Sequence, residues 1–254
     1  MLFKDIPGNN DTKQQLINSI ISGRIAHAQL FYGPNGSAKL ALALSYARYV
    51  NCQNKLPSDS CGSCSSCTKY NNLEHPDLHL VFPVIKTNKI KNTISDHYLN
   101  EWRNLVLENA YLSIQDWAEE FKGENKMGQT GMIYKDQSKN ISEKIKLKSY
   151  ESSYKVVLIW CAEKMNKEAA NKLLKLIEEP PQNTLFLLTT NNKNKLLKTI
   201  LSRLQITNVS NFKKKDVLGY FDHIDTEKYK IVQEQVGALN YDLGSIFRLL
   251  NNQD

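Results

Sequence analysis

Residues 155–205 constrain the fold more than any other part of the chain. The segment opens with an apolar run, 156–160, which is rich in β-branched residues and too short for a buried helix, so it predicts a strand covered on both faces. A helix should follow, because Asn166 can cap its first turn, apolar residues recur at three- and four-residue spacing, and Pro180 ends it. A second buried strand is predicted at 184–190. Together they form a βαβ unit, which indicates an α/β fold with functional residues at the carboxyl ends of parallel strands.

A second pattern of strand, turn and helix lies near the N-terminus. Residues 28–32 predict a buried strand, and the loop 33–40, GPNGSAKL, leads into an alanine-rich helix. A glycine-containing turn at a helix N-terminus is the setting of a phosphate-binding P-loop. Gly33, Gly36 and Lys39 are therefore candidate nucleotide-binding residues. The sequence leaves open whether Lys39 binds a phosphate weakly or is a solvated lysine at the start of the helix.

The loop departs from the P-loop pattern G-x-x-x-x-G-K-[ST] at two positions. Ala38 replaces the second glycine, and Leu40 replaces the Ser or Thr whose oxygen binds Mg²⁺. A leucine side chain cannot coordinate a hard cation. We therefore expect ATP binding to be weak or absent.

Four cysteines occur in the spacing C-x8-C-x2-C-x2-C, namely Cys52, Cys61, Cys64 and Cys67. Three thiols at three-residue intervals on a tight turn can converge on one ion, and Cys52, at the expected end of the preceding helix, can supply the fourth corner of a tetrahedron. Four thiolates leave no open coordination position, so we predict a structural Zn²⁺ site in a module of about residues 51–70. The alternative, four reduced surface cysteines, would leave reactive thiols exposed.

The run AEKMN..AANKLLKLIEEPP..TLFLLTT, with the dipeptide SR at a fixed distance downstream, resembles the AAA+ clamp-loader ATPases of bacterial replication, most closely their delta-prime subunits. The resemblance extends over nearly the whole chain, and LLKLIEEPP and SR are its most specific parts. It implies an AAA+ P-loop-type α/β domain with a five-stranded parallel sheet and a zinc insert over residues 1–210. A small lid domain of three helices would follow over 211–254. Family members continue into a helical collar domain, so we expect this chain to be truncated before its collar.

The resemblance also bears on catalysis. In the family an Asp-Glu pair at the end of the third strand holds the metal and polarises the attacking water, whereas Trp160 and Cys161 stand at those positions here. This loss and the loss of the hydroxyl at Leu40 both predict a fold that does not hydrolyse ATP. The alternative is an unusual ATPase that uses Glu163.

Arg203 matches the arginine that family members direct across a subunit interface at the γ-phosphate of the next subunit. A guanidinium is planar and permanently charged, and it can neutralise charge that develops on phosphoryl oxygens. The resemblance therefore implies that Arg203 acts in trans as an arginine finger for a neighbouring ATPase. The alternative is an ordinary surface ion pair.

Residues 86–140 form a polar excursion that the compact family pattern lacks. Two amphipathic helices are predicted in it, at about 95–108 and 114–121, and their apolar faces are expected to pack on the parent domain. The glycine-containing segment 123–134 predicts a mobile link. Three lysines near the start of the excursion could instead contact a DNA backbone: Lys86, Lys89 and Lys91.

After residue 209 the pattern predicts helices only, at 214–223, 225–238 and 242–250, as in the lid of the family. Family motors often carry a nucleotide-sensing arginine in a G-x-x-R segment of the lid. Here Phe247 occupies that place and Arg248 lies one residue later, which argues against a sensing role.

The composition limits the compartment and the partners. The chain has 254 residues, of which 41% are hydrophobic, and a net charge of +7, a basic excess that is milder than in a dedicated DNA-binding arm. No apolar run approaches the length of a membrane span, so we expect a cytoplasmic protein that does not contact a membrane.

Three functions are consistent with these patterns. The first is a non-catalytic stator of the delta-prime type, which works with the ATPase motor and delta subunits to load the sliding clamp on primed DNA. The second is an active AAA+ motor of the same complex, and the third is a zinc-dependent nucleic-acid-binding protein. The chain alone is expected to be monomeric.

Overall fold

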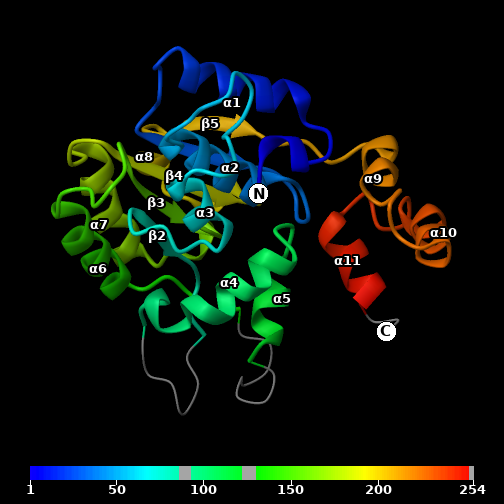
Figure 1. The fold of residues 1–254 in the computed structure, drawn as a ribbon. Coiled ribbons are helices and arrows are strands. Elements are labelled where there is room, and N and C mark those ends of the chain that lie inside the picture. The colour runs from blue at the N-terminus through cyan, green and yellow to red at the C-terminus, as the bar shows by residue number, and fades with distance from the viewer. Residues whose placement is uncertain (86–92, 122–129, 252–254) are drawn as a thin grey trace.

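The centre of the molecule is a five-stranded sheet in which all neighbouring strands are parallel, in the order β2-β3-β4-β1-β5 (Figure 1). The structure is a computed structural model, and it describes residues 1–85, 93–121 and 130–251. The predicted α/β fold with a five-stranded parallel sheet is confirmed. The strands are β1 Ala28–Tyr32, β2 Leu78–Val81, β3 Lys155–Ile159, β4 Thr184–Thr190 and β5 Gln205–Asn208.

Helices cover both faces of the sheet, because successive side chains of a strand point to opposite faces. In β3, Val156 and Leu158 belong to one buried apolar cluster and Val157 and Ile159 to the other. The first face carries α1 Asn10–Ile21, α2 Lys39–Asn51 and α3 Ser65–Asn71. The second face carries α6 Lys135–Lys146, α7 Lys167–Glu178 and α8 Lys198–Leu201.

Local signals account for the start of α7 and the end of α1. The side chain of Asn166 accepts a hydrogen bond from the backbone N–H of Ala169, as an N-cap does. Gly23 follows α1 with φ +69°, a left-handed conformation that glycine adopts without strain.

Helix α6 is the main element that the sequence pattern missed, since residues 135–140 were assigned to a polar excursion. Only Ile141 and Ile145 are large apolar residues on its buried face, and both pack toward α7. The expected mobile link is also wrong for residues 130–134, because Met132 pairs with Val84 and the buried Ile133 pairs with Met165. The rest of that link, and the three lysines proposed to contact DNA, lie outside the described residues.

The two predicted insertion helices are present as α4 Leu99–Glu108 and α5 Ile114–Glu119. They pack on the sheet domain as expected: the Trp102 ring stacks on Phe82 at a centroid distance of 4.9 Å, and the Trp117 indole N–H donates to the carbonyl of Pro83 at 2.7 Å.

Three short helices follow the sheet: α9 Lys214–Tyr220, α10 Thr226–Gln235 and α11 Leu243–Asn251. Of these, α11 lies beside the insertion helices in Figure 1. Among the described residues, no helix is long and apolar enough to cross a membrane.

Candidate functional site

The P-loop begins where β1 ends, beside the end of β4. The N–H of Gly33 donates to the carbonyl of Thr190 at 3.2 Å, and a Cβ on Gly33 would lie 2.5 Å from the carbonyl oxygen of Val209. Gly36 has φ +64°, in the left-handed region. Both positions therefore require glycine for the path of the backbone, whether or not the loop binds a phosphate.

Lys39 is buried and its ammonium group donates to the carbonyl of Pro34 at 2.7 Å. Burial lowers the pKa of Lys39, and the nearby charges of Cys161, Glu163 and Asp242 oppose that shift. The alternative of a solvated lysine at the helix start is therefore wrong. The side chain is folded back onto its own loop.

The end of β3 lies next to the P-loop and carries Trp160 and Cys161 at the positions where the family resemblance places two carboxylates. Cys161 is buried with φ +54°, and burial raises the pKa of its thiol well above the usual value. The nearest carboxylate along the chain, that of Glu163, accepts a hydrogen bond from the hydroxyl of Thr190 at 2.6 Å. Glu163 is thus bound to the end of β4.

An acidic residue that sequence analysis did not select lies directly on the P-loop. A Cβ built on Gly36 would be 1.8 Å from Oδ1 of Asp242, so the carboxylate rests against the backbone of the glycine. Asp242 comes from the turn before α11, and the two residues are far apart in the sequence. The contact depends on how the C-terminal helices pack on the sheet, so the sequence contains no local signal for it.

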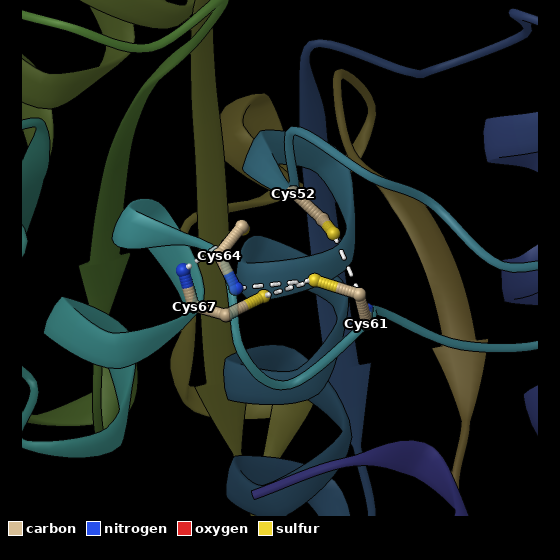
Figure 2. Close-up of side chains that lie close together, drawn as sticks. All are labelled: Cys52, Cys61, Cys64 and Cys67. Atoms are coloured by element: carbon tan, nitrogen blue, oxygen red, sulfur yellow. Dashed lines mark hydrogen bonds between the residues drawn. The ribbon is translucent and has the colours of Figure 1, made fainter.

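The four predicted cysteines converge at the far end of α2 (Figure 2). Their sulfur atoms all lie within 4.8 Å of one another, and those of Cys61 and Cys67 are 3.9 Å apart. Four sulfurs at the usual Zn–S distance of about 2.3 Å in a tetrahedron would be roughly 3.8 Å apart. The spacing therefore fits a single tetrahedral ion.

Backbone N–H groups point at these sulfurs. The N–H of Cys61 donates to the sulfur of Cys52 at 3.3 Å, that of Cys64 to Cys61 at 3.3 Å, and that of Cys67 to Cys64 at 3.4 Å. Hydrogen bonds from the backbone of Ser63 and Cys64 lower the pKa of the Cys61 thiol to about 6. Such donors favour thiolates, which are the form that binds metal.

The cysteine loop is attached to the N-terminal segment by a buried arginine. The guanidinium of Arg48 donates to the carbonyls of Met1 and Gly62, at 3.1 and 3.2 Å. In addition, the carboxylate of Asp59 accepts the N–H of Lys4 at 3.0 Å. The loop is therefore built into the first face of the sheet domain.

Arg203 lies between α8 and the edge strand β5. Its Nη2 atom is 2.6 Å from Oε1 of Glu178, and its Nη1 atom donates to the carbonyl of Thr199 at 2.9 Å. The side chain remains 40% exposed. The surface ion pair that was considered as an alternative is present, and the side chain is not buried by it.

Arg248 points away from the P-loop. Its Nη1 atom lies 2.5 Å from Oδ1 of Asp116 and 3.2 Å from the hydroxyl of Ser113, both in the insertion. The insertion therefore engages Arg248, and the expectation that Arg248 does not sense nucleotide stays a prediction.

The parallel sheet, the loop after β1 and the three following helices define an α/β protein with a helical C-terminal part. Residues 8–213 match the model of the family described as DNA polymerase III, delta subunit, and the chain belongs to this family. The matched span includes the P-loop, the cysteines and Arg203.

The relatives carry related names. The chain is 33% identical over 190 residues to DNA polymerase III subunit delta' of Bacillus subtilis, and 30% identical over 192 residues to the delta' subunit of Pseudomonas aeruginosa; each match covers 75% of this chain. It is 26% identical over 230 residues, 90% of this chain, to subunit tau of Bacillus subtilis. The chain spans 44%, 45% and 33% of the length of these three relatives, respectively.

Proposed function

We propose that this chain is a non-catalytic stator subunit of the delta-prime type, which helps a DNA polymerase III clamp loader place the sliding clamp on primed DNA. The observation that carries the proposal is the P-loop itself. Leu40 stands where a magnesium-binding hydroxyl is needed, Trp160 and Cys161 stand where carboxylates are needed, and the ammonium of Lys39 is bound to Pro34. The similarity to delta' subunits and the lack of magnesium ligands in the loop both favour a subunit that positions a neighbouring ATPase but does not itself hydrolyse ATP.

Arg203 would act on the neighbouring motor subunit. The ion pair with Glu178 fixes the direction of the guanidinium at the surface, and its 40% exposure leaves donors for an incoming phosphate. Supplying such a fork in trans accelerates phosphoryl transfer by about 10³ to 10⁵ in well-studied GTPases. A subunit without its own magnesium ligands would thereby control the hydrolysis rate of its neighbour.

The four cysteines would hold one structural Zn²⁺. The sulfur geometry fits a tetrahedral ion, and a complete set of four thiolates leaves no coordination position for a substrate. Bound zinc would tie the loop after α2 to α3. The remaining partners would be the motor and delta subunits, with the clamp and primed DNA met through the complex in the cytoplasm.

The test is the DNA-stimulated ATPase rate of a clamp loader assembled with the full-length protein. Arg203→Ala should lower this rate at least about tenfold while leaving assembly intact, and Arg203→Lys should restore little because it has charge without the fork. The exposed Arg24 supplies a matched control, since Arg24→Ala removes a surface arginine elsewhere. An unchanged rate with Arg203→Ala would refute the trans role.

Glu178→Gln separates the finger from the ion pair. If Arg203 serves only to pair with Glu178, Glu178→Gln and Arg203→Ala should change the DNA-stimulated ATPase rate by the same factor. If Arg203 acts on a phosphate, Glu178→Gln should retain most of the activity that Arg203→Ala loses.

A second candidate function, an active ATPase, rests on the position of Glu163. Its carboxylate is bound to Thr190 at the end of β4, close enough to influence the pKa of Lys39. Phosphate release by the isolated chain that disappears in Glu163→Gln would favour this candidate over the stator.

A further inference from the structure

The carboxylate of Asp242 lies directly against the backbone of the P-loop at Gly36. A Cβ on Gly36 would be 2.2 Å from Cγ of Asp242 and 2.9 Å from its Oδ2, so the whole carboxylate covers this glycine. The group is held in place, because Oδ1 accepts the N–H of Ser245 at 2.8 Å in the first turn of α11. A phosphate at Gly36 would therefore meet both a steric block and a like charge.

The first turn of α11 is itself packed directly on the insertion. A Cβ on Gly244 would lie 2.5 Å from the carbonyl oxygen of Tyr111, in the link between α4 and α5. The aromatic ring of Tyr111 is stacked with that of Phe247 at a centroid distance of 6.3 Å and meets Phe212 edge-on at 5.6 Å. The insertion thus touches the same helix that carries Asp242 into the P-loop.

Polar contacts join the same two elements. Arg248 of α11 is paired with Asp116 and donates to Ser113 of the insertion, while the amide of Asn251 donates to the carboxylate of Glu108 at 3.1 Å. The Arg248 pair is partly buried, with the carboxylate of Asp116 only 12% exposed. Such a pair is less screened than one on the open surface.

The insertion is anchored to the sheet domain at its other side. The Trp102 ring contacts both Phe82 and Trp160, with centroid distances of 4.9 and 6.0 Å, and Trp117 donates to the carbonyl of Pro83. Trp160 is the residue at the end of β3. The contacts therefore form a continuous chain from the sheet through the insertion and α11 back to the P-loop.

We propose that residues 93–121 are an internal strap that fixes α11 against the sheet domain, and that the carboxylate of Asp242 thereby occupies the phosphate position of the P-loop. The ligand of this loop is a side chain of the same polypeptide. The strap keeps the C-terminal helices in one orientation without nucleotide, where a nucleotide-binding relative would use the bound phosphates to do so. The proposal does not depend on the clamp-loader role.

Asp242→Asn tests the occupied phosphate position. Asparagine can still cap α11 but carries no charge, and Asp225→Asn is the matched control because Asp225 caps α10 by accepting the N–H of Lys228 at 2.9 Å. The probe is a fluorescent ATP analogue in EDTA, so that magnesium plays no part. We expect Asp242→Asn to bind the probe at least about tenfold more tightly than both the parent and the control, and equal affinities would overturn the occupation of the loop by Asp242.

Gly244→Ala tests the strap. The added methyl group would clash with the carbonyl of Tyr111 and push α11 away, whereas Gly219→Ala in α9 adds the same methyl group where nothing lies within 4 Å. Amide hydrogen exchange by mass spectrometry should rise at least about tenfold in residues 33–39 and 111–116 of Gly244→Ala, and stay at the parent level in Gly219→Ala.

Arg248→Gln is the milder variant, which keeps α11 and removes its charged contact with the insertion. It should raise exchange in the same two segments by a smaller factor while the strands keep their protection. Parent-level exchange at residues 33–39 in both Gly244→Ala and Arg248→Gln would show that the strap does not hold Asp242 on the loop.

Discussion

The two ends of α2 differ in what they can still bind. At its N-terminus, the P-loop is in contact with other groups of the protein. The ammonium of Lys39 donates to the carbonyl of Pro34, and the carboxylate of Asp242 covers Gly36. At its C-terminus, Cys52 and three further cysteines converge with a geometry that suits an added ion. The loop at the N-terminal end is thus covered by a residue from a distant part of the chain, whereas the sulfur atoms at the C-terminal end come from one short segment that could hold an ion.

The largest effect is expected at the cysteine end. Cys64→Ser should lower the affinity for zinc at least about 100-fold and open the loop 52–67, because structural zinc contributes roughly 10 to 16 kcal/mol of apparent binding free energy in small peptides. The strands should survive, since the sheet has its own core. Elemental analysis and chelator competition measure the loss.

Ser65→Ala is the control for that substitution, because Ser65 is exposed in the same loop. It should retain one zinc per chain. If the parent protein itself contains no stoichiometric metal after purification with zinc present, the cysteine end of α2 is not a metal site and the comparison of the two ends fails.

Acid protonates thiolates and would release a bound metal, which lowers stability. The protonation of His79 also lowers stability in acid, and the two contributions must be measured separately. Burial, and then the charge of Lys144, lower the pKa of His79 in β2 to about 4, while Asp77, Asp96 and Lys155 are the other charged groups that act on it. Because the folded-state pKa lies below the unfolded value of about 6.5, the folded protein binds fewer protons. The contribution of His79 to the free energy of unfolding is fully present above about pH 6.5. It is lost as the pH drops toward 4, by at most about 3 kcal/mol.

His79→Gln should remove this slope from the free energy of unfolding measured in urea between pH 7.5 and 4.5. The exposed His97 provides the control, since His97→Gln should keep the slope of the parent. Identical slopes in the parent and His79→Gln would assign the acid response to the cysteine end or to other groups.

The smallest effect is expected at the P-loop end. Restoring the motif with Ala38→Gly and Leu40→Thr together should leave ATP turnover below detection, because Asp242 still covers Gly36 and Trp160 and Cys161 still supply no carboxylate. Steady-state phosphate release measures this outcome. Turnover in the ordinary range of about 1 to 100 s⁻¹ would show that these two departures from the motif had by themselves silenced the loop.

The sheet could be predicted from sequence because its signals are local. The apolar runs of β3 and β4, the cap at Asn166 and the glycine before α2 each act within a few residues. The cysteine cluster belongs to the same group, since its sulfur atoms come from residues 52–67 and the spacing alone limits how far apart they can lie. Helix α6 was missed because its sequence, KDQSKNISEKIK, contains only two large apolar residues, and it is stabilised by contact with α7.

The sequence by itself determined the α/β fold, the position of the P-loop and the convergence of four thiols. Only the tertiary structure decided what fills the P-loop and which way Arg248 points. Asp242 meets Gly36, and Arg248 meets Asp116, across more than a hundred residues of chain. Each side chain also has a local partner at Ser245, but these local contacts do not show which distant residue it meets. Their positions follow from how two sets of helices that are distant in the sequence pack, and that packing depends on the summed burial of Tyr111, Trp102 and their neighbours, which no short segment encodes.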